Sequence, residues 1–172
     1  MNAKELERFS NYIESTHHFY LKKEIPRLSK LMEEVTRIHG GRHFELIYLR
    51  KFFDGFASRL ERETAEETRH LIELVAGLSG NGSPHWINPE TLRRASRDFL
   101  SKRSRIERSI QQLKTLSQDF TPPVDTCQKY RALFSGLQDL SRQLQIELNL
   151  ERALVLPLLA AAEENTGHKE AG

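Results

Sequence analysis

The feature that most constrains the fold is the spacing of apolar residues, which recur at steps of three and four along four long segments. The second segment carries the series Leu46, Leu49, Phe53, Phe56, Leu60, Glu63, Glu67, His70, Leu74 and Leu78. The last segment carries Leu133, Leu137, Leu140, Leu144, Glu147, Glu151, Leu154 and Leu158. Steps of three and four keep side chains on one face of an α-helix. The chain is therefore predicted to be all-α.

Glycine and proline clusters divide the 172-residue chain into four predicted helices. These helices run from about Ala3 to His39, Phe44 to Leu78, Pro89 to Thr121 and Val124 to Glu164. Pro26 should kink the first helix, because it removes a backbone donor and crowds the preceding turn. Gly40 and Gly41 should end that helix. Short loops predict a single domain, residues 1–164, built as an up-down-up-down four-helix bundle with a flexible tail at 165–172.

Composition excludes several classes of protein. The chain is 38% hydrophobic and 29% charged, which suits a soluble helical protein, and its net charge of +2 gives no indication of a nucleic-acid partner. Cys127 is the only cysteine, so no disulfide framework is expected. The start, MNAKELERF, lacks the apolar core of a signal peptide. The longest apolar run, Ala153 to Ala162, is about half the length of a membrane span. The expected location is the cytoplasm, without membrane attachment.

Four glutamates occupy stripe positions at which leucine would be expected, namely Glu63, Glu67, Glu147 and Glu151. A lone carboxylate is costly to bury, so these side chains need cations. Short loops place position 18 opposite 63, position 63 near 103, and the turn at 147–151 within a turn or two of that level. One layer of the core is therefore predicted to contain His18, Glu63, Glu67, Arg103, Glu147 and Glu151.

Two interpretations of this layer are open, besides a pattern out of phase that leaves the glutamates on solvated faces. The first is a metal site, because carboxylate oxygens suit iron, manganese, magnesium or calcium. Glu67 and His70 also have the Glu-x-x-His spacing of ferritin-like di-iron bundles. Four glutamates against Arg103 and a protonated His18 leave two surplus negative charges, which would suit a divalent cation or bound protons. The second interpretation is a metal-free polar network, because the guanidinium of Arg103 repels cations.

The remaining histidines are interpreted with the same stripes. Only one of His17 and His18 can face the core, and the downstream stripe favours His18. His39 and His43 flank the glycine turn, where the helix dipole explains a histidine better than a surface metal clip does. His70 is interpreted as a core histidine in preference to a ligand.

Two further features have plain interpretations. Cys127 has no base near it on its stripe and is predicted to be a small buried residue. Residues 102–108, KRSRIER, are predicted to form a solvated basic face of the third helix.

Two stretches resemble a known family. Residues 16–43 read THHFYLKKEIPRLSKLMEEVTRIHGGRH and resemble the first helix of hemerythrin-like (HHE) proteins of the iron–sulfur cluster repair group, the RIC or ScdA-like proteins. Residues 119–157 read DFTPPVDTCQKYRALFSGLQDLSRQLQIELNLERALVLP and are similar to the start and body of their last helix. The similarity covers roughly residues 5–160. It implies a complete hemerythrin-type bundle, without the short cysteine-bearing domain that often precedes it in this family.

The resemblance implies two irons held by histidines and by two bridging glutamates, each four residues after a histidine. His18 matches the first-helix histidine, and Glu67 and Glu151 match the bridging glutamates. The other three histidine positions hold Glu63, Arg103 and Glu147. His39 matches a further histidine of the family. It lies 21 residues after His18, about 30 Å along a helix axis, so the two cannot share a site unless the helix breaks.

By the same resemblance, the expected role is in the response to nitrosative or oxidative stress. It would act through iron handling, binding of the small gases NO and O₂, or repair of damaged iron–sulfur clusters, with iron–sulfur proteins as partners. Glu67 and Glu151 would bridge two irons, or manganese in their place, and His18, Glu63 and Glu147 would be terminal ligands. The alternative is a metal-free, degenerate bundle that binds a partner or regulates. The sequence indicates no substrate pocket and makes no prediction of enzymatic activity.

Overall fold

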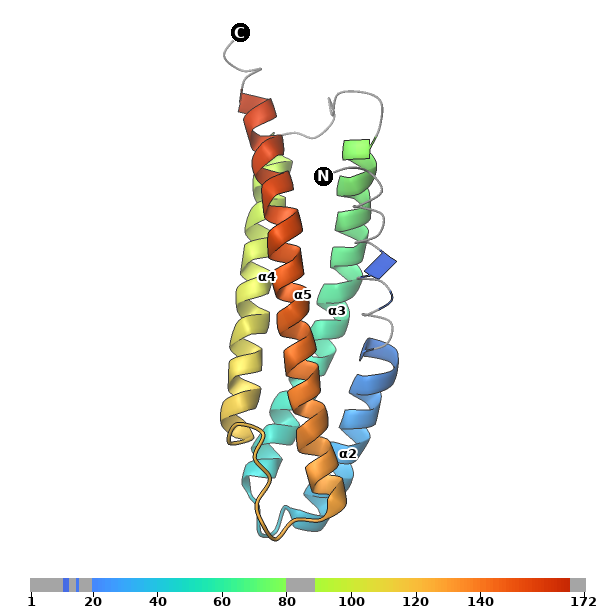
Figure 1. The fold of residues 1–172 in the computed structure, drawn as a ribbon, viewed down its shortest axis with the longest axis vertical. Helices are drawn as coiled ribbons and strands as arrows, with labels where there is room; N and C mark the ends of the chain where they lie inside the picture. Colours follow the sequence, from blue (N-terminus) through green and yellow to red (C-terminus); the bar gives the residue numbers. More distant parts are fainter. Residues whose placement is uncertain (1–10, 13–14, 16–19, 80–88, 168–172) are drawn as a thin grey trace.

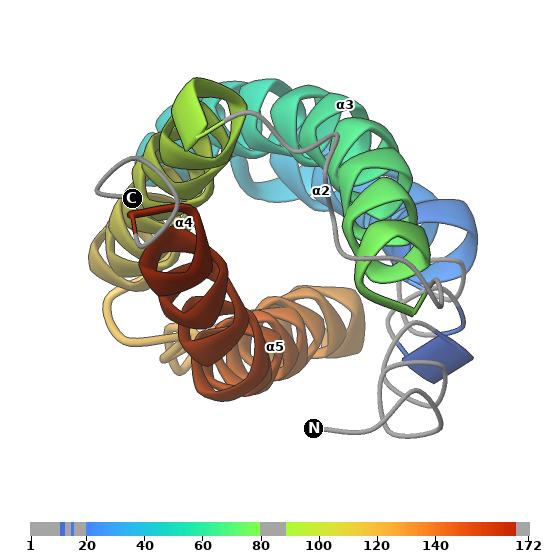
Figure 2. The same cartoon turned by 90° about the horizontal axis from the view of Figure 1, so that it is seen from above.

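A computed structural model describes residues 11–12, 15, 20–79 and 89–167. A π-helical turn, η1 (Tyr20–Glu24), leads into α2 (Ile25–His39), α3 (Glu45–Ser79), α4 (Pro89–Leu116) and α5 (Gln128–Gly167) (Figure 1). Each helix packs beside the next, and α5 returns to pack beside α2, as Figure 2 shows. No strand occurs within these residues. The predicted all-α, up-down-up-down four-helix bundle is confirmed.

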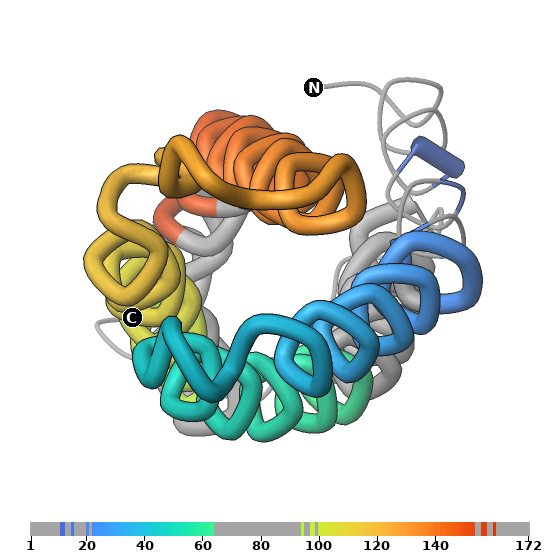
Figure 3. The backbone as a smooth tube through the Cα atoms, turned by 90° about the horizontal axis from the view of Figure 1, so that it is seen from below, coloured from blue at the N-terminus to red at the C-terminus, as the bar shows by residue number. Residues whose placement is uncertain are grey.

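The predicted apolar stripes form the core. The buried side chains of α3 are Leu46, Leu49, Phe53, Phe56 and Leu60, and those of α5 include Leu133, Leu137, Leu140 and Leu144. α2 adds Leu28, Met32 and Val35, and α4 adds Ile106 and Leu113. Figure 3 shows the helices in a ring around this core. Burial of each large apolar side chain stabilises the bundle by about 1.5–3 kcal/mol relative to exposure.

The first helix differs from the prediction at Pro26. Instead of one kinked helix, the structure has the wide turn η1 followed by α2, with Pro26 in the first turn of α2. Proline has no backbone N–H, and the first turn of a helix needs none for its internal ladder. α2 ends where predicted, at Gly40, whose N–H donates to the carbonyl of Thr36 at 2.8 Å. Gly40 keeps a right-handed conformation, with φ −61°.

The connection between α4 and α5 is longer than predicted. α4 ends at Leu116 rather than near Thr121, and α5 begins at Gln128 rather than Val124. Three successive residues adopt left-handed φ angles: Gln118 (49°), Asp119 (60°) and Phe120 (58°). The hydroxyl of Ser117 donates to the Leu113 carbonyl (2.7 Å) and accepts the Phe120 N–H (3.1 Å). This local hydrogen bonding competes with continuation of the helix.

The membrane prediction concerns the same helices. Within the described ranges, no helix combines the length and apolar character needed to cross a bilayer.

The last helix is slightly longer than predicted. α5 extends to Gly167, three residues beyond the predicted end, which is close to the usual uncertainty of a helix terminus.

Candidate functional site

Two carboxylates of α5 lie in the interior of the bundle. Glu147 and Glu151 are one turn apart and are each only 4% exposed. They continue the stripe that buries Leu140 and Leu144, so the helix that forms the core also turns these acids inward. A buried carboxylate needs cationic or hydrogen-bonding partners. The partners of this layer come from α3 and α4.

Glu63 on α3 pairs with a cation that the sequence analysis did not single out. Nε of Arg105, on α4, donates to Oε1 of Glu63 at 2.9 Å. The Glu63 side chain is 18% exposed and that of Arg105 is 45% exposed. Nη1 of Arg105 also donates to the hydroxyl of Ser101 at 2.8 Å. Glu63 therefore lies at the rim of the acidic layer, against α4.

Arg103 is largely buried but makes different contacts from those expected. Its Nη1 donates to the backbone carbonyl of Leu148 on α5. Its Nη2 pairs with Oε1 of Glu107, one turn along α4, at 2.9 Å. The described contacts of Arg103 are therefore with Glu107 and the Leu148 carbonyl and not with one of the four stripe glutamates. The side chain instead links α4 to the α5 backbone between Glu147 and Glu151.

Lys102 is a further cation whose charge interacts with this layer. Burial lowers the pKa of its ammonium group, and the carboxylates of Glu151, Glu63 and Glu147 act against this effect, in that order of size. The positive charge of Arg105 adds to the lowering of the pKa. The Lys102 ammonium group thus lies in the field of all three carboxylates.

The prediction of a solvated basic face was wrong for Lys102 and Arg103, which are both partly buried. A signal was present in the sequence, because Lys102 lies three residues after Phe99 and four before Ile106, on the edge of the apolar stripe. Lys102 and Arg105 also change the charge count. They add two positive charges and Glu107, the partner of Arg103, adds one negative charge, so the surplus falls from two negative charges to one.

Tyr20 also lies near the buried acids. Burial is the largest cause that raises the pKa of its hydroxyl, and the negative charge of Glu147 is the second largest. Tyr20 is the first residue of η1, which packs against α5. The first segment of the bundle therefore approaches the layer through a tyrosine at this level.

The described side chains of this layer do not form the set of iron ligands that the resemblance implies. His18 lies outside the described residues, and Glu67 and His70 lie in α3 with side chains outside the description. Among the described side chains, no group of three or more His, Cys, Asp or Glu residues is arranged to hold a metal. Glu63 is engaged by Arg105, and Lys102 lies among the acids. The described donors do not fit an iron centre in this conformation, and the ligand assignments stay predictions.

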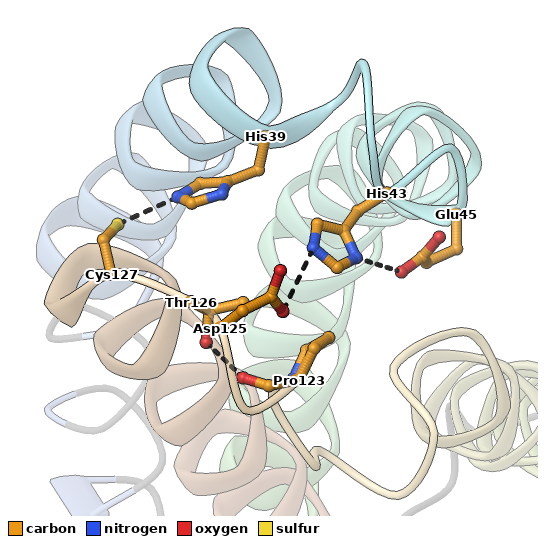
Figure 4. Close-up of polar contacts among 7 residues, drawn as sticks. All are labelled: His39, His43, Glu45, Pro123, Asp125, Thr126 and Cys127. Atoms are coloured by element: carbon orange, nitrogen blue, oxygen red, sulfur yellow. Dashed lines mark hydrogen bonds and ion pairs between the residues drawn. The ribbon is translucent and has the colours of Figure 1, made fainter.

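A second polar cluster lies at the opposite end of α2, where the α2–α3 turn meets the start of α5 (Figure 4). Nε2 of His39 is 3.1 Å from Sγ of Cys127. Nδ1 of His43 is 3.2 Å from Glu45 Oε1, and its Nε2 is 3.8 Å from Asp125 Oδ1. The prediction that Cys127 has no base near it on its own stripe did not anticipate this contact. The base comes from another helix, 88 residues away in the sequence, and the spacing along one stripe carries no such information.

Curated proteins are similar to this chain over most of its length. The chain is 25% identical over 144 residues to "Iron-sulfur cluster repair protein ScdA" of Staphylococcus haemolyticus, covering 81% of the chain. It is 24% identical over 148 residues to "Iron-sulfur cluster repair protein YtfE" of Yersinia pseudotuberculosis, covering 86% of the chain. It spans 61% and 62% of the lengths of these relatives. No family model matches, and no solved structure matches.

The all-helical bundle is consistent with a hemerythrin-like four-helix bundle, and over most of its length the chain is similar to relatives named for iron–sulfur cluster repair. The resemblance to the iron–sulfur cluster repair group, predicted from residues 16–43 and 119–157, is confirmed by relatives of that name over most of the chain.

Proposed function

We propose that this chain acts in the repair of iron–sulfur clusters during nitrosative or oxidative stress, in the cytoplasm. The observation that carries this proposal is the similarity to proteins named for that repair over 81% to 86% of the chain. The bundle that the structure describes contains the α5 turn with its two buried glutamates. Damaged iron–sulfur proteins are the proposed targets.

Iron is the metal that this class implies. The proposed ligands are Glu67 and Glu151 as bridges, with His18, Glu63 and Glu147 as terminal ligands. Binding there requires Glu63 to release Arg105, which now occupies its Oε1 at 2.9 Å. It also requires the ammonium group of Lys102 to leave the field of the acids. Because the described donors do not fit iron in this conformation, no chemical step is assigned to it.

A metal-free bundle that binds a partner protein is the second candidate function. The position of Lys102 supports it, because an internal ammonium group can supply part of the positive charge that a metal would otherwise bring to the layer. Under this proposal, the acidic layer is a structural polar network and the repair role is exerted through protein contacts.

Metal analysis after anaerobic purification from iron-supplied cells separates the two candidates. A metal centre predicts about two irons per chain, as in other di-iron bundles. The metal-free bundle predicts no bound iron and an unchanged thermal midpoint when Fe(II) or Mn(II) is added. Substitution of Glu67→Ala should release iron in the first case. In the second case it should leave the midpoint unchanged or raise it.

Repair itself can be tested with an iron–sulfur hydratase that NO has inactivated. The chain and ferrous iron should restore its activity faster than ferrous iron alone. The double substitution Glu147→Gln and Glu151→Gln tests the buried layer, with Glu107→Gln, on a side chain that is 41% exposed, as the matched control. Recovery no faster than with ferrous iron alone contradicts the repair role. Equal recovery by the wild-type chain and the double variant contradicts only the use of the acidic layer.

A further inference from the structure

The cluster between α2 and α5 pairs a thiol with an imidazole. His39 is the last residue of α2, and Cys127 immediately precedes α5, where its carbonyl accepts the N–H of Arg131 at 3.2 Å. Figure 4 shows the His39 ring directed at the sulfur. The separation of 3.1 Å between Nε2 and Sγ is short enough for the thiol to donate a hydrogen bond to a neutral imidazole.

The imidazole is held in this position by an aromatic contact. The ring of Tyr130 meets the His39 ring edge to face, with ring centroids 5.4 Å apart. It meets the His43 ring at 5.6 Å in the same way. Tyr130 is fully buried and follows Cys127 by three residues, so the aromatic support lies in the first turn of α5, directly after the thiol. The pair is therefore a fixed feature of the packed bundle end.

Two further buried polar atoms belong to this cluster. Within the described part of the chain, the hydroxyl of Tyr130 and Nε2 of His43 have no hydrogen-bond partner. Burial raises the pKa of Tyr130 to about 12, and Glu45 and Asp125 add to the effect. The hydroxyl thus lies in the field of the two carboxylates that flank His43, and it stays protonated. The hydroxyl of Tyr130 can hydrogen-bond an oxygen added to the cluster.

We propose that Cys127 is a peroxide-sensitive thiol, with His39 as the base that takes its proton. Sγ attacks one oxygen of hydrogen peroxide, a sulfur–oxygen bond forms, and the oxygen–oxygen bond breaks. Nε2 of His39 accepts the thiol proton and returns it to the departing hydroxide, which leaves as water. The sulfur is oxidised by two electrons to sulfenic acid and the peroxide is reduced by two electrons.

The chain permits this chemistry at one place only. Cys127 is the single cysteine of the 172 residues, so every thiol signal reports on it. It is partly exposed, which admits a molecule as small as peroxide. The new oxygen would lie at the start of α5, where first-turn N–H groups lack helical partners. The proposal is independent of iron and of the repair role.

The test follows sulfenic acid formation on the intact chain by mass spectrometry, with a cyclic diketone as the trap. Hydrogen peroxide is the probe, and a chelator removes adventitious metal. The variants are His39→Gln, which removes the base, and Cys127→Ser, which should give no product. His43→Gln is the matched control, because its ring contacts the same Tyr130 but lies 6.1 Å from the His39 centroid and makes no contact with the sulfur that the structure describes.

The native chain should react with peroxide at least about tenfold faster than the same chain unfolded in urea, given the usual size of general-base assistance. His39→Gln should remove most of this advantage, and His43→Gln should stay within about twofold of wild type. A native rate equal to or below the unfolded rate overturns the proposal, and this comparison does not depend on any variant folding. A wild-type rate in a folded His39→Gln chain also overturns it.

Discussion

Arg105 reaches across from α4 to Glu63 on α3, with 2.9 Å between Nε and Oε1. The pair joins two helices at the rim of the acidic layer, and it occupies a carboxylate that the sequence assigned to metal. Its strength decides how readily Glu63 is released for any other partner.

The first prediction concerns this pair. Because the Arg105 side chain is 45% exposed, solvent screens the attraction, and the coupling free energy should be about 0.5–1 kcal/mol. Urea unfolding of Glu63→Gln, Arg105→Gln and the double variant measures it. One molar salt should reduce the coupling. The pair Arg94–Asp98, at 4.0 Å and more exposed, is the control and should couple more weakly. A coupling insensitive to salt would contradict the prediction.

The second prediction concerns the close approach of α5 to α2. A Cβ atom on Gly136 would lie 2.5 Å from Cδ2 of Leu28 and 3.0 Å from Nη2 of Arg27. Leu28 is fully buried, so Gly136→Ala should lower the free energy of unfolding by about 1–3 kcal/mol through overpacking.

Gly55 provides the control for Gly136. A Cβ atom there would meet only Nη1 of Arg59 at 3.5 Å, an ordinary contact. Gly55→Ala in the interior of α3 should therefore raise the free energy of unfolding by roughly 0.5–1 kcal/mol. Urea denaturation of both variants checks the pair, and a Gly136→Ala chain as stable as wild type would refute the packing argument.

The third prediction is a pH dependence. The pKa of Tyr130 is about 12 in the folded chain, against an ordinary value of 10.0. Between these values the unfolded chain releases the proton while the folded chain retains it, so stability falls as pH rises. The loss should be about 2–3 kcal/mol between the two pKa values. Tyr130→Phe should abolish it and, by removing a buried hydroxyl, should cost little at pH 7.

Chemical denaturation from pH 8 to pH 12 measures the third effect. The exposed Tyr48→Phe is the matched control and should keep the wild-type decline. An unchanged decline in Tyr130→Phe would assign the alkaline loss to other groups.

The fourth prediction concerns Lys102. Burial lowers the pKa of its ammonium group more than the acids raise it, so the charged form is less favourable in the folded chain than in the unfolded chain. Lys102→Met should therefore leave the free energy of unfolding at pH 7 unchanged or raise it. Lys51→Met, at an exposed position of α3, should change stability little. Urea unfolding of both variants measures this, and a Lys102→Met chain clearly less stable than wild type would show that attraction to the acids outweighs desolvation of the ammonium.

The sequence predicted the fold well because the bundle is encoded in local spacing. The stripe from Leu46 to Leu60 is buried throughout, and Glu147 and Glu151 lie inward on the continuation of the α5 stripe. The connection between α4 and α5 was not predicted, because left-handed φ angles at Gln118, Asp119 and Phe120 involve no glycine. The turn also uses the hydroxyl of Ser117. A serine hydroxyl can bond backbone groups in a helix as well as in a turn, so its presence in the sequence does not indicate which of the two forms.

The candidate site was only partly predictable, for a different reason. Spacing along one helix identifies the buried acids but not which cation on a neighbouring helix reaches them. Arg105 and Lys102 were placed on a solvated face, whereas their long side chains extend to Glu63 and into the acidic layer. The His39–Cys127 contact depends on how two helix ends meet, 88 residues apart. Such contacts require the packed arrangement of the helices.

The π-helical turn at Tyr20–Glu24 has a consequence for chain length. A turn with i→i+5 hydrogen bonds contains one residue more than an α-helical turn needs. Deleting one residue between positions 20 and 24 would therefore permit a continuous α-helix into Ile25, while α2 keeps its own packing against α3 and α5. Because the wide turn takes up that residue, the direction in which the chain enters Tyr20 would stay nearly the same relative to α2. The wide turn thus accommodates one additional residue without moving the chain before it to another face of the helix.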